Sequence, residues 1–251
     1  MHGRPWYIGP TAQRATGPRA HRRDDDGCWE RALSPYWRRR LARHTLLAGA
    51  AALLSWLLVL GYPNARAVWR ISIGTGYVGL AYLGWTLFLG PRNVLRRRPN
   101  PVSTDLRRDI AIWAAALGII HFIAGWQVHL WPSAYFFWGP EWRFIPLRYD
   151  FFGLANWSGL AAVALLGGLL VISNDLSLRK LGVRLWKMLQ RWAYVAFLLT
   201  AAHALAYAVI EQRAWPLLTA LGLLLLAPVL AQWMGYRAYR LEQPERLEPE
   251  H

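Results

Sequence analysis

The chain has 251 residues, 55% of them hydrophobic, and carries a formal net charge of +15. This apolar excess, with charge confined to short stretches, suits a bilayer better than a water-soluble domain. The single cysteine, Cys28, excludes an intramolecular disulfide framework and a cysteine-based zinc site. A basic chain of this kind could bind nucleic acid or a membrane surface, and the positions of its 29 lysines and arginines decide between them.

The N-terminal stretch is polar. Residues 1 to about 35 are rich in Arg, Pro, Gly and Asp and contain no apolar run of the length that a signal peptide requires. We therefore expect residues 1–43 to form a retained, disordered, basic tail in the cytoplasm.

Six segments are long and apolar enough to cross the hydrocarbon core, for which a helix needs about 20 residues. They cover about residues 44–62, 68–90, 109–131, 151–173, 189–210 and 215–236. No room is left for a soluble domain, and residues 237–251 form a short C-terminal tail. The sequence therefore predicts an all-α membrane protein, a six-transmembrane helix bundle.

Basic residues gather on alternate sides of these spans. The two tails and the loops 91–108 and 174–188 contain 23 lysines and arginines, whereas the other three loops contain four. The positive-inside rule then places both termini in the cytoplasm, with the bundle in the cell inner membrane. Anionic lipid accounts for this distribution, so nucleic acid is disfavoured as a partner.

The long loop 132–150 falls on the predicted outer side. Aromatic residues such as Trp138 and Trp142 alternate there with Pro and Gly. Such rings favour the headgroup region, so we expect the loop to lie flat on the outer interface, with a lid over the bundle as the alternative.

Two histidines lie within the predicted spans. His121 is 12 residues beyond the cytoplasmic start of the third span, about 18 Å along the axis, and His203 is 14 residues beyond the start of the fifth, about 21 Å. Matched depth in the outer half would let both imidazoles serve as axial ligands of one b-type haem. An isolated intramembrane histidine is most often a hydrogen-bonded structural residue, and this alternative stays open for each.

Small residues surround both histidines. Ala114, Ala115, Ala116 and Gly118 precede His121, while Ala201, Ala202, Ala204 and Ala206 flank His203. They would leave room for a macrocycle, although ordinary transmembrane packing uses the same residues. We do not expect the other histidines to be ligands. They are His129 near the outer end of the third span, His44 at the start of the first span, and His2, His21 and His251 in the tails.

Two runs of sequence resemble a known family. They are RRDIAIWAAALGIIH at residues 107–121 and SNDLSLRKLGVRLWKMLQRWAYVAFLLTAAHALAY at residues 173–207. Both are similar to the ferric-reductase-like transmembrane domain family, and most closely to the MsrQ/YedZ type, the haem-binding membrane subunits of periplasmic methionine sulfoxide reductases. The shared positions are Arg107, Arg108, His121, Lys180, Leu181, Gly182, Trp186, Leu189, Tyr194 and His203. The resemblance covers about residues 68–236.

Two positions depart from the family pattern. Gln190 stands where the family has a histidine, and a glutamine amide is a poor substitute for imidazole as an iron ligand. The resemblance therefore implies that any second haem site near the inner face is empty here. Tyr77 follows Thr75 and Gly76 where the family has an arginine, which removes a basic partner for the haem propionates.

The resemblance implies an electron-transfer subunit of an oxidoreductase rather than a complete enzyme. One haem b in the outer half of the membrane, with His121 and His203 as its iron ligands, would take electrons from a quinol or a flavin reductase and pass them to a periplasmic oxidoreductase. A bound quinone is a second expected cofactor. The alternative is a haem-poor or haem-less structural or assembly subunit of a larger membrane complex. A transporter ranks low, because no acidic residue is predicted deep inside a span.

Overall fold

Seven helices make up the part of the chain that the computed structural model describes, which is residues 35–97, 105–128, 137 and 150–242. They are α1 (Pro35–Val59), α2 (Ala67–Leu95), α3 (Asp105–Val128), α4 (Phe151–Ile172), α5 (Asp175–Gln190), α6 (Trp192–Ile210) and α7 (Trp215–Glu242). These residues contain no β-strand. Residues 1–39 and 40–251 form two separate units, and the description below concerns the second.

Six helical stretches are long and apolar enough to span a membrane. They are α1, α2, α3, α4, the pair α5 and α6 taken together, and α7. The chain is therefore a multi-pass membrane protein with an all-α helix bundle, as the sequence predicts. Its lipid-facing surface is rich in large apolar side chains that a soluble protein would bury, among them Leu46, Leu54, Val171, Leu198, Val209 and Leu223.

Several helices extend beyond their predicted bounds. α1 begins at Pro35 and not near residue 44, so the end of the predicted tail 1–43 is helical. α7 likewise continues to Glu242, past the predicted end at residue 236. In both cases the extra turns are rich in arginine, which can stay helical while its charge reaches the headgroup region. Residues 1–34 and 243–251 lie outside the described part of the chain.

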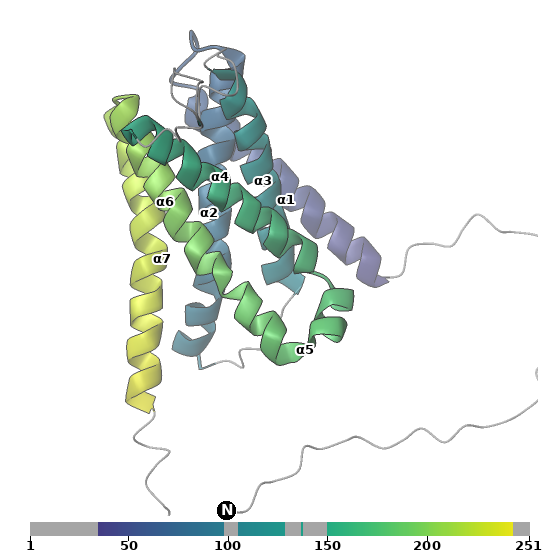
Figure 1. Ribbon diagram of the computed structural model, residues 1–251. Coiled ribbons are helices and arrows are strands. Elements are labelled where there is room, and N and C mark those ends of the chain that lie inside the picture. Colours follow the sequence, from purple (N-terminus) through teal and green to yellow (C-terminus); the bar gives the residue numbers. More distant parts are fainter. Residues whose placement is uncertain (1–34, 98–104, 129–136, 138–149, 243–251) are drawn as a thin grey trace, which may run out of the picture. The chain divides into compact units, whose positions relative to one another are not determined.

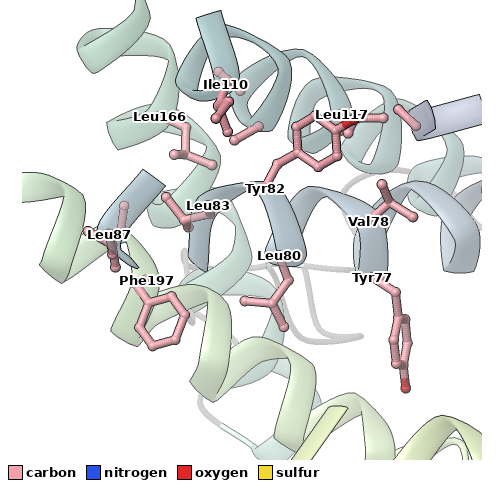
Figure 2. Packing of buried hydrophobic residues seen from close by; sticks show 14 of the residues in the cluster. Tyr77, Val78, Leu80, Tyr82, Leu83, Leu87, Ile110, Leu117, Leu166 and Phe197 are labelled. Atoms are coloured by element: carbon pink, nitrogen blue, oxygen red, sulfur yellow. The ribbon is translucent and has the colours of Figure 1, made fainter. Parts of the chain in front are cut away.

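The helix α2 occupies the centre of the bundle. It packs most extensively on α3 and also contacts α7 and α6, while α4 packs on α6 (Figure 1). Side chains of α2 meet Ile110 and Leu117 of α3, Leu166 of α4 and Phe197 of α6 in one buried apolar cluster (Figure 2). This cluster holds α2, α3, α4 and α6 around the site described below.

A helix that the sequence does not predict connects α4 to α6. The segment 174–188 is expected to be a loop, but α5 covers most of it. Asn174 caps the helix by accepting a hydrogen bond from the Ser177 N–H, and Trp186 Nε1 donates to the Ile172 carbonyl oxygen at 3.0 Å. Gly182 interrupts α5 with a positive φ of 73°, a conformation that is essentially reserved for glycine.

Candidate haem site

The two intramembrane histidines lie next to each other. His121 comes from α3 and His203 from α6, and their ring centroids are 5.8 Å apart with the ring planes at 81°. The approach follows from the helix packing, because α3 and α6 each pack on both α2 and α4 and all four helices line one cavity. The depth match inferred from the sequence thus corresponds to direct proximity, while ligation itself stays a prediction.

Backbone carbonyl groups fix the proton on each imidazole. His121 Nδ1 lies 2.8 Å from the Ser72 carbonyl oxygen on α2, and His203 Nδ1 lies 2.8 Å from the Ala155 carbonyl oxygen on α4. A carbonyl oxygen only accepts, so each Nδ1 carries the hydrogen and donates it. The lone pair of a neutral ring is then on Nε2, and neither Nε2 has a hydrogen-bond partner among the described residues.

Two glycines make room for these rings. A Cβ at Gly76 on α2 would lie 2.8 Å from His121 Nδ1, and a Cβ at Gly159 on α4 would lie 2.5 Å from His203 Nδ1. Both distances are too short for any side chain. Glycine at 76 and 159 therefore lets each imidazole press against the neighbouring helix, which brings it within reach of the carbonyl group that orients it.

A cavity of about 150 Å³ opens beside the two rings. Its walls come from α2, α3, α4, α6 and α7 and are mostly apolar; residues facing it include Leu80, Ala114, Gly118, Ala162, Thr200, Ala204 and Leu221. Of the small residues singled out in the sequence, Ala114, Gly118 and Ala204 line the cavity, whereas Ala115 is buried in the apolar cluster. A flat macrocycle would lie between the two imidazole rings, so the distance between these rings decides whether it fits.

The residues present fit a bis-imidazole haem. With a metal–nitrogen bond of about 2 Å on each side, two imidazoles on opposite faces of one metal ion have centroids roughly 6 Å apart. The observed 5.8 Å is close to this value. Hydrogen bonds from the distal ring nitrogens to carbonyl groups are also the usual support of metal-ligating histidines. The described residues contain no group of three or more His, Cys, Asp or Glu able to hold a bare metal ion, but a haem brings its own ring nitrogens.

A comparison with protein families agrees with this architecture. The model of the ferric reductase like transmembrane component matches residues 75–201, half of the chain. The chain belongs to this family. Membership indicates a role in electron transfer at a membrane, and proteins of this ferric-reductase-like family commonly bind haem. The matched region contains His121 and Gln190 and ends two residues before His203.

Gln190 is the position at which the resemblance predicts a histidine for a second haem. It is the last residue of α5, and its Nε2 donates to Ser173 Oγ at 3.3 Å. Arg107 of α3 donates from Nε to the Thr86 carbonyl oxygen of α2 at 3.3 Å. The glutamine side chain thus ties α5 to the end of α4.

Two polar residues that the sequence did not single out, Tyr207 and Asn156, lie beside His203. The Tyr207 ring lies 4.9 Å from the His203 ring, and its hydroxyl donates to Asn156 Oδ1 at 2.6 Å. Tyr207 and Asn156 are both buried and line the cavity. Their signal in the sequence is weak: Tyr207 follows His203 by one helical turn, which puts both on one face of α6.

The connection between α6 and α7 brings a charged residue to the cavity. Glu211, Gln212 and Arg213 end α6 in a Schellman motif: the Arg213 N–H donates to the Ala208 carbonyl oxygen, and Gln212 adopts a left-handed φ of 46°. Arg213 then reaches back to Tyr77 on α2, whose hydroxyl oxygen lies 3.3 Å from Nη1. Tyr77 is the position at which the resemblance predicts an arginine, and in this structure Arg213 places a cation next to it.

Another charged cluster lies between α1 and α3, away from the histidine pair. Asp109 of α3 is fully buried, with Arg43 Nε 2.7 Å from Oδ2 and Arg40 and His44 each 3.2 Å from Oδ1. His44 also accepts a hydrogen bond from Trp113 Nε1 at 3.1 Å. His44 is thus part of an ion cluster and does not line the cavity. The other histidines that were not expected to be ligands, His2, His21, His129 and His251, and the loop around Trp138 and Trp142 lie outside the described residues.

Proposed function

We propose that this protein is a haem b-binding membrane subunit that passes electrons across the bilayer, with His121 and His203 as the axial ligands of the iron. The observation that carries the proposal is the pair of imidazoles 5.8 Å apart, each with Nδ1–H bonded to a carbonyl oxygen and with no partner for Nε2 among the described residues. A structural histidine would normally use both ring nitrogens in hydrogen bonds when buried. These two rings leave the metal-binding nitrogen free.

The chain's own residues would have three tasks at such a site. A bound haem supplies one-electron redox chemistry. His121 and His203 would hold the iron, and the carbonyl groups of Ser72 and Ala155 keep each ring in the tautomer that presents a lone pair. The apolar walls of the cavity exclude water and lower the local dielectric.

One haem is proposed, in the half of the bundle that contains both histidines. Gln190 offers no imidazole at the other end, and its amide is already bonded to Ser173. A single haem leaves a long distance to any electron donor in the cytoplasm. A quinol that reaches the site through the bilayer is therefore the simpler donor, with a flavin reductase as the second candidate.

The electron acceptor is proposed to be a periplasmic oxidoreductase. Support comes from the residues shared with the MsrQ/YedZ type, namely the Lys180–Leu181–Gly182 motif, Trp186 and Tyr194. Gly182 adopts a conformation that only glycine tolerates well, which gives this motif a physical reason. The basic face of α5 fits a cytoplasmic membrane surface, with both termini on that side of the inner membrane.

The test is the visible spectrum of the purified protein after reduction with dithionite. We expect a sharp b-type α band that is lost in His121→Ala and in His203→Ala, and that exogenous imidazole restores in His203→Gly by filling the vacated position. His44→Gln is the matched control, because this histidine does not line the cavity and glutamine can still donate to Asp109.

A protein that stays colourless after expression with added haem precursor would overturn the proposal and favour the haem-less assembly subunit. An α band that survives both alanine substitutions would leave haem binding intact but reject these two ligands. Circular dichroism of each variant separates loss of haem from loss of the helical fold.

A further inference from the structure

Arg213 is a buried cation at the edge of the histidine cavity. Its side chain is only 8% exposed and lines the same cavity as His121 and His203. A buried guanidinium is costly in a low-dielectric environment unless anions and hydrogen-bond acceptors surround it. The contacts of Arg213 therefore indicate whether the protein alone satisfies it.

The described residues use only part of the hydrogen-bonding capacity of the Arg213 guanidinium. Nε lies 3.4 Å from Glu211 Oε2, and Nη1 donates to the Tyr77 hydroxyl at 3.3 Å, with the guanidinium 5.5 Å from the centre of the Tyr77 ring. A guanidinium has five N–H donors, and these contacts use two of them. The others have no acceptor among the described residues. The ion pair with Glu211 is also long and involves a single nitrogen–oxygen contact, so it is weaker than a bidentate pair.

The surroundings of Arg213 are asymmetric. Arg213 lines the mostly apolar cavity with the two histidines and also a second hollow, which shares Trp69, Val128 and Glu211 with that cavity. Arg66 lines this second hollow too, so it contains two arginines near the connection from α6 to α7. An elongated ligand in the cavity would therefore have an apolar body and an anionic edge at this end.

We propose that Arg213 binds the propionate carboxylates of the haem and so fixes the edge of the macrocycle toward the connection 211–214. This inference rests on the proposed haem function. Haem is the ligand that matches both halves of the site, because its macrocycle is apolar and its two carboxylates lie on one edge. Tyr77 positions the guanidinium through its hydroxyl, which is itself anchored by donating to the Leu217 carbonyl oxygen at 3.0 Å.

The sharpest test compares haem with its dimethyl ester, in which both carboxylates are masked. Full-length protein prepared without haem is titrated with haemin and with haemin dimethyl ester, and binding is followed by the Soret band. We expect the wild type to bind haemin at least tenfold more tightly than the ester. Arg213→Gln should bind the two equally, and Arg213→Lys should retain part of the discrimination.

Two further variants define the charge effect. Glu211→Gln removes the competing carboxylate and should increase the preference for haemin, whereas Arg237→Gln, an arginine that stacks on Trp233 of α7, should leave it unchanged. The midpoint potential should fall in Arg213→Gln, because a nearby cation stabilises the reduced haem, which carries one more negative charge. This potential is measured on the haem-bound protein and does not depend on turnover.

Equal binding of haemin and its ester by the wild type would overturn the inference and assign Arg213 to another anion, such as a lipid phosphate. A preference for haemin that persists in Arg213→Gln would overturn it as well. Both results leave the histidine ligands untouched. Failure of the wild type to bind either compound would instead reject the haem proposal as a whole.

Discussion

The guanidinium of Arg43 on α1 lies 2.7 Å from the carboxylate of Asp109, which is fully buried on α3. Arg40 and His44 approach the same carboxylate, so Asp109 is the anion that holds the start of α1 against α3. We predict that Asp109→Asn lowers the stability by about 3–5 kcal/mol, because it leaves two partly buried arginines without their counter-charge. The measurement is unfolding in mild detergent, followed by circular dichroism.

The control for this prediction is Asp105→Asn in the first turn of α3, which should change stability by about 1 kcal/mol or less. The double variant Arg43→Leu/Asp109→Leu should recover part of the loss, since it removes a pair and not a single charge. Wild-type stability in Asp109→Asn would contradict the role given to the cluster.

Alanine at Gly76 or Gly159 should displace the imidazole that touches it. The added Cβ would lie 2.8 Å from His121 Nδ1 or 2.5 Å from His203 Nδ1, so the ring must leave its carbonyl partner. Overpacking of this size costs about 1–3 kcal/mol. We expect a loss of roughly tenfold or more in haem affinity, measured by Soret titration.

Gly167→Ala is the matched control for these two substitutions. Gly167 also lies in α4, and a Cβ there meets nothing within 4 Å. Its haem affinity should equal that of the wild type. If Gly76→Ala and Gly159→Ala bind haem as tightly as Gly167→Ala does, the close contact between these glycines and the imidazoles does not affect haem binding.

Gly182→Ala should disrupt the bend within α5. The φ of 73° and ψ of 161° at this position strain any residue with a side chain, at a cost of about 1–3 kcal/mol. Gly222→Ala in α7 is the control, because its Cβ has open space and an ordinary helical backbone, and alanine there should be neutral or stabilising. Thermal unfolding of both variants checks the difference, and equal effects would refute it.

Reporter fusions test the orientation that the basic loops predict. Fusions at residues 100 and 181 should report a cytoplasmic location, and a fusion at residue 140 an exterior one. The opposite pattern would move the histidine pair to the inner half of the membrane. It would also turn the acceptor side proposed above toward the cytoplasm.

The sequence predicts the six-helix membrane fold correctly, and the structure brings together the two histidines whose depths match, because both depend on patterns that are local in the chain. Apolar runs of membrane length determine where helices lie, and a constant rise per residue turns the positions of His121 and His203 into depths. Membership of the ferric-reductase-like transmembrane family is confirmed as well, and the closeness to the MsrQ/YedZ type stays a prediction. That the two imidazoles bind iron stays a prediction.

Hydropathy alone does not predict the helix α5, because the segment is too basic for a membrane span. The sequence does contain signals for it: Asn174 is a favoured N-cap residue followed by the acidic Asp175, and Leu178, Leu181 and Leu185 recur at helical spacing. A helix on a membrane surface shows periodicity without high mean hydropathy.

The polar contacts of Asp109 and Arg213 could not be read from the sequence, because they join residues far apart in the chain. Asp109 looked like an ordinary acidic residue near a helix start, and Arg213 like one basic residue in a short outer loop. Only the three-dimensional structure shows the ion pair from Arg43 of α1 to Asp109 of α3, and the tight turn after α6 that brings Arg213 to its partners.

The central position of α2 has a consequence for how the protein is made. α2 is the most deeply buried of the six spans and has the lowest mean hydropathy, with polar residues such as Ser72 and Thr86 turned toward its neighbours. Released alone into lipid from the translocon, it would be the least favourable span to integrate. Its partner α3 is synthesised immediately afterwards and packs extensively on α2. We therefore expect α2 and α3 to enter the membrane together as one helical hairpin, and not one helix at a time.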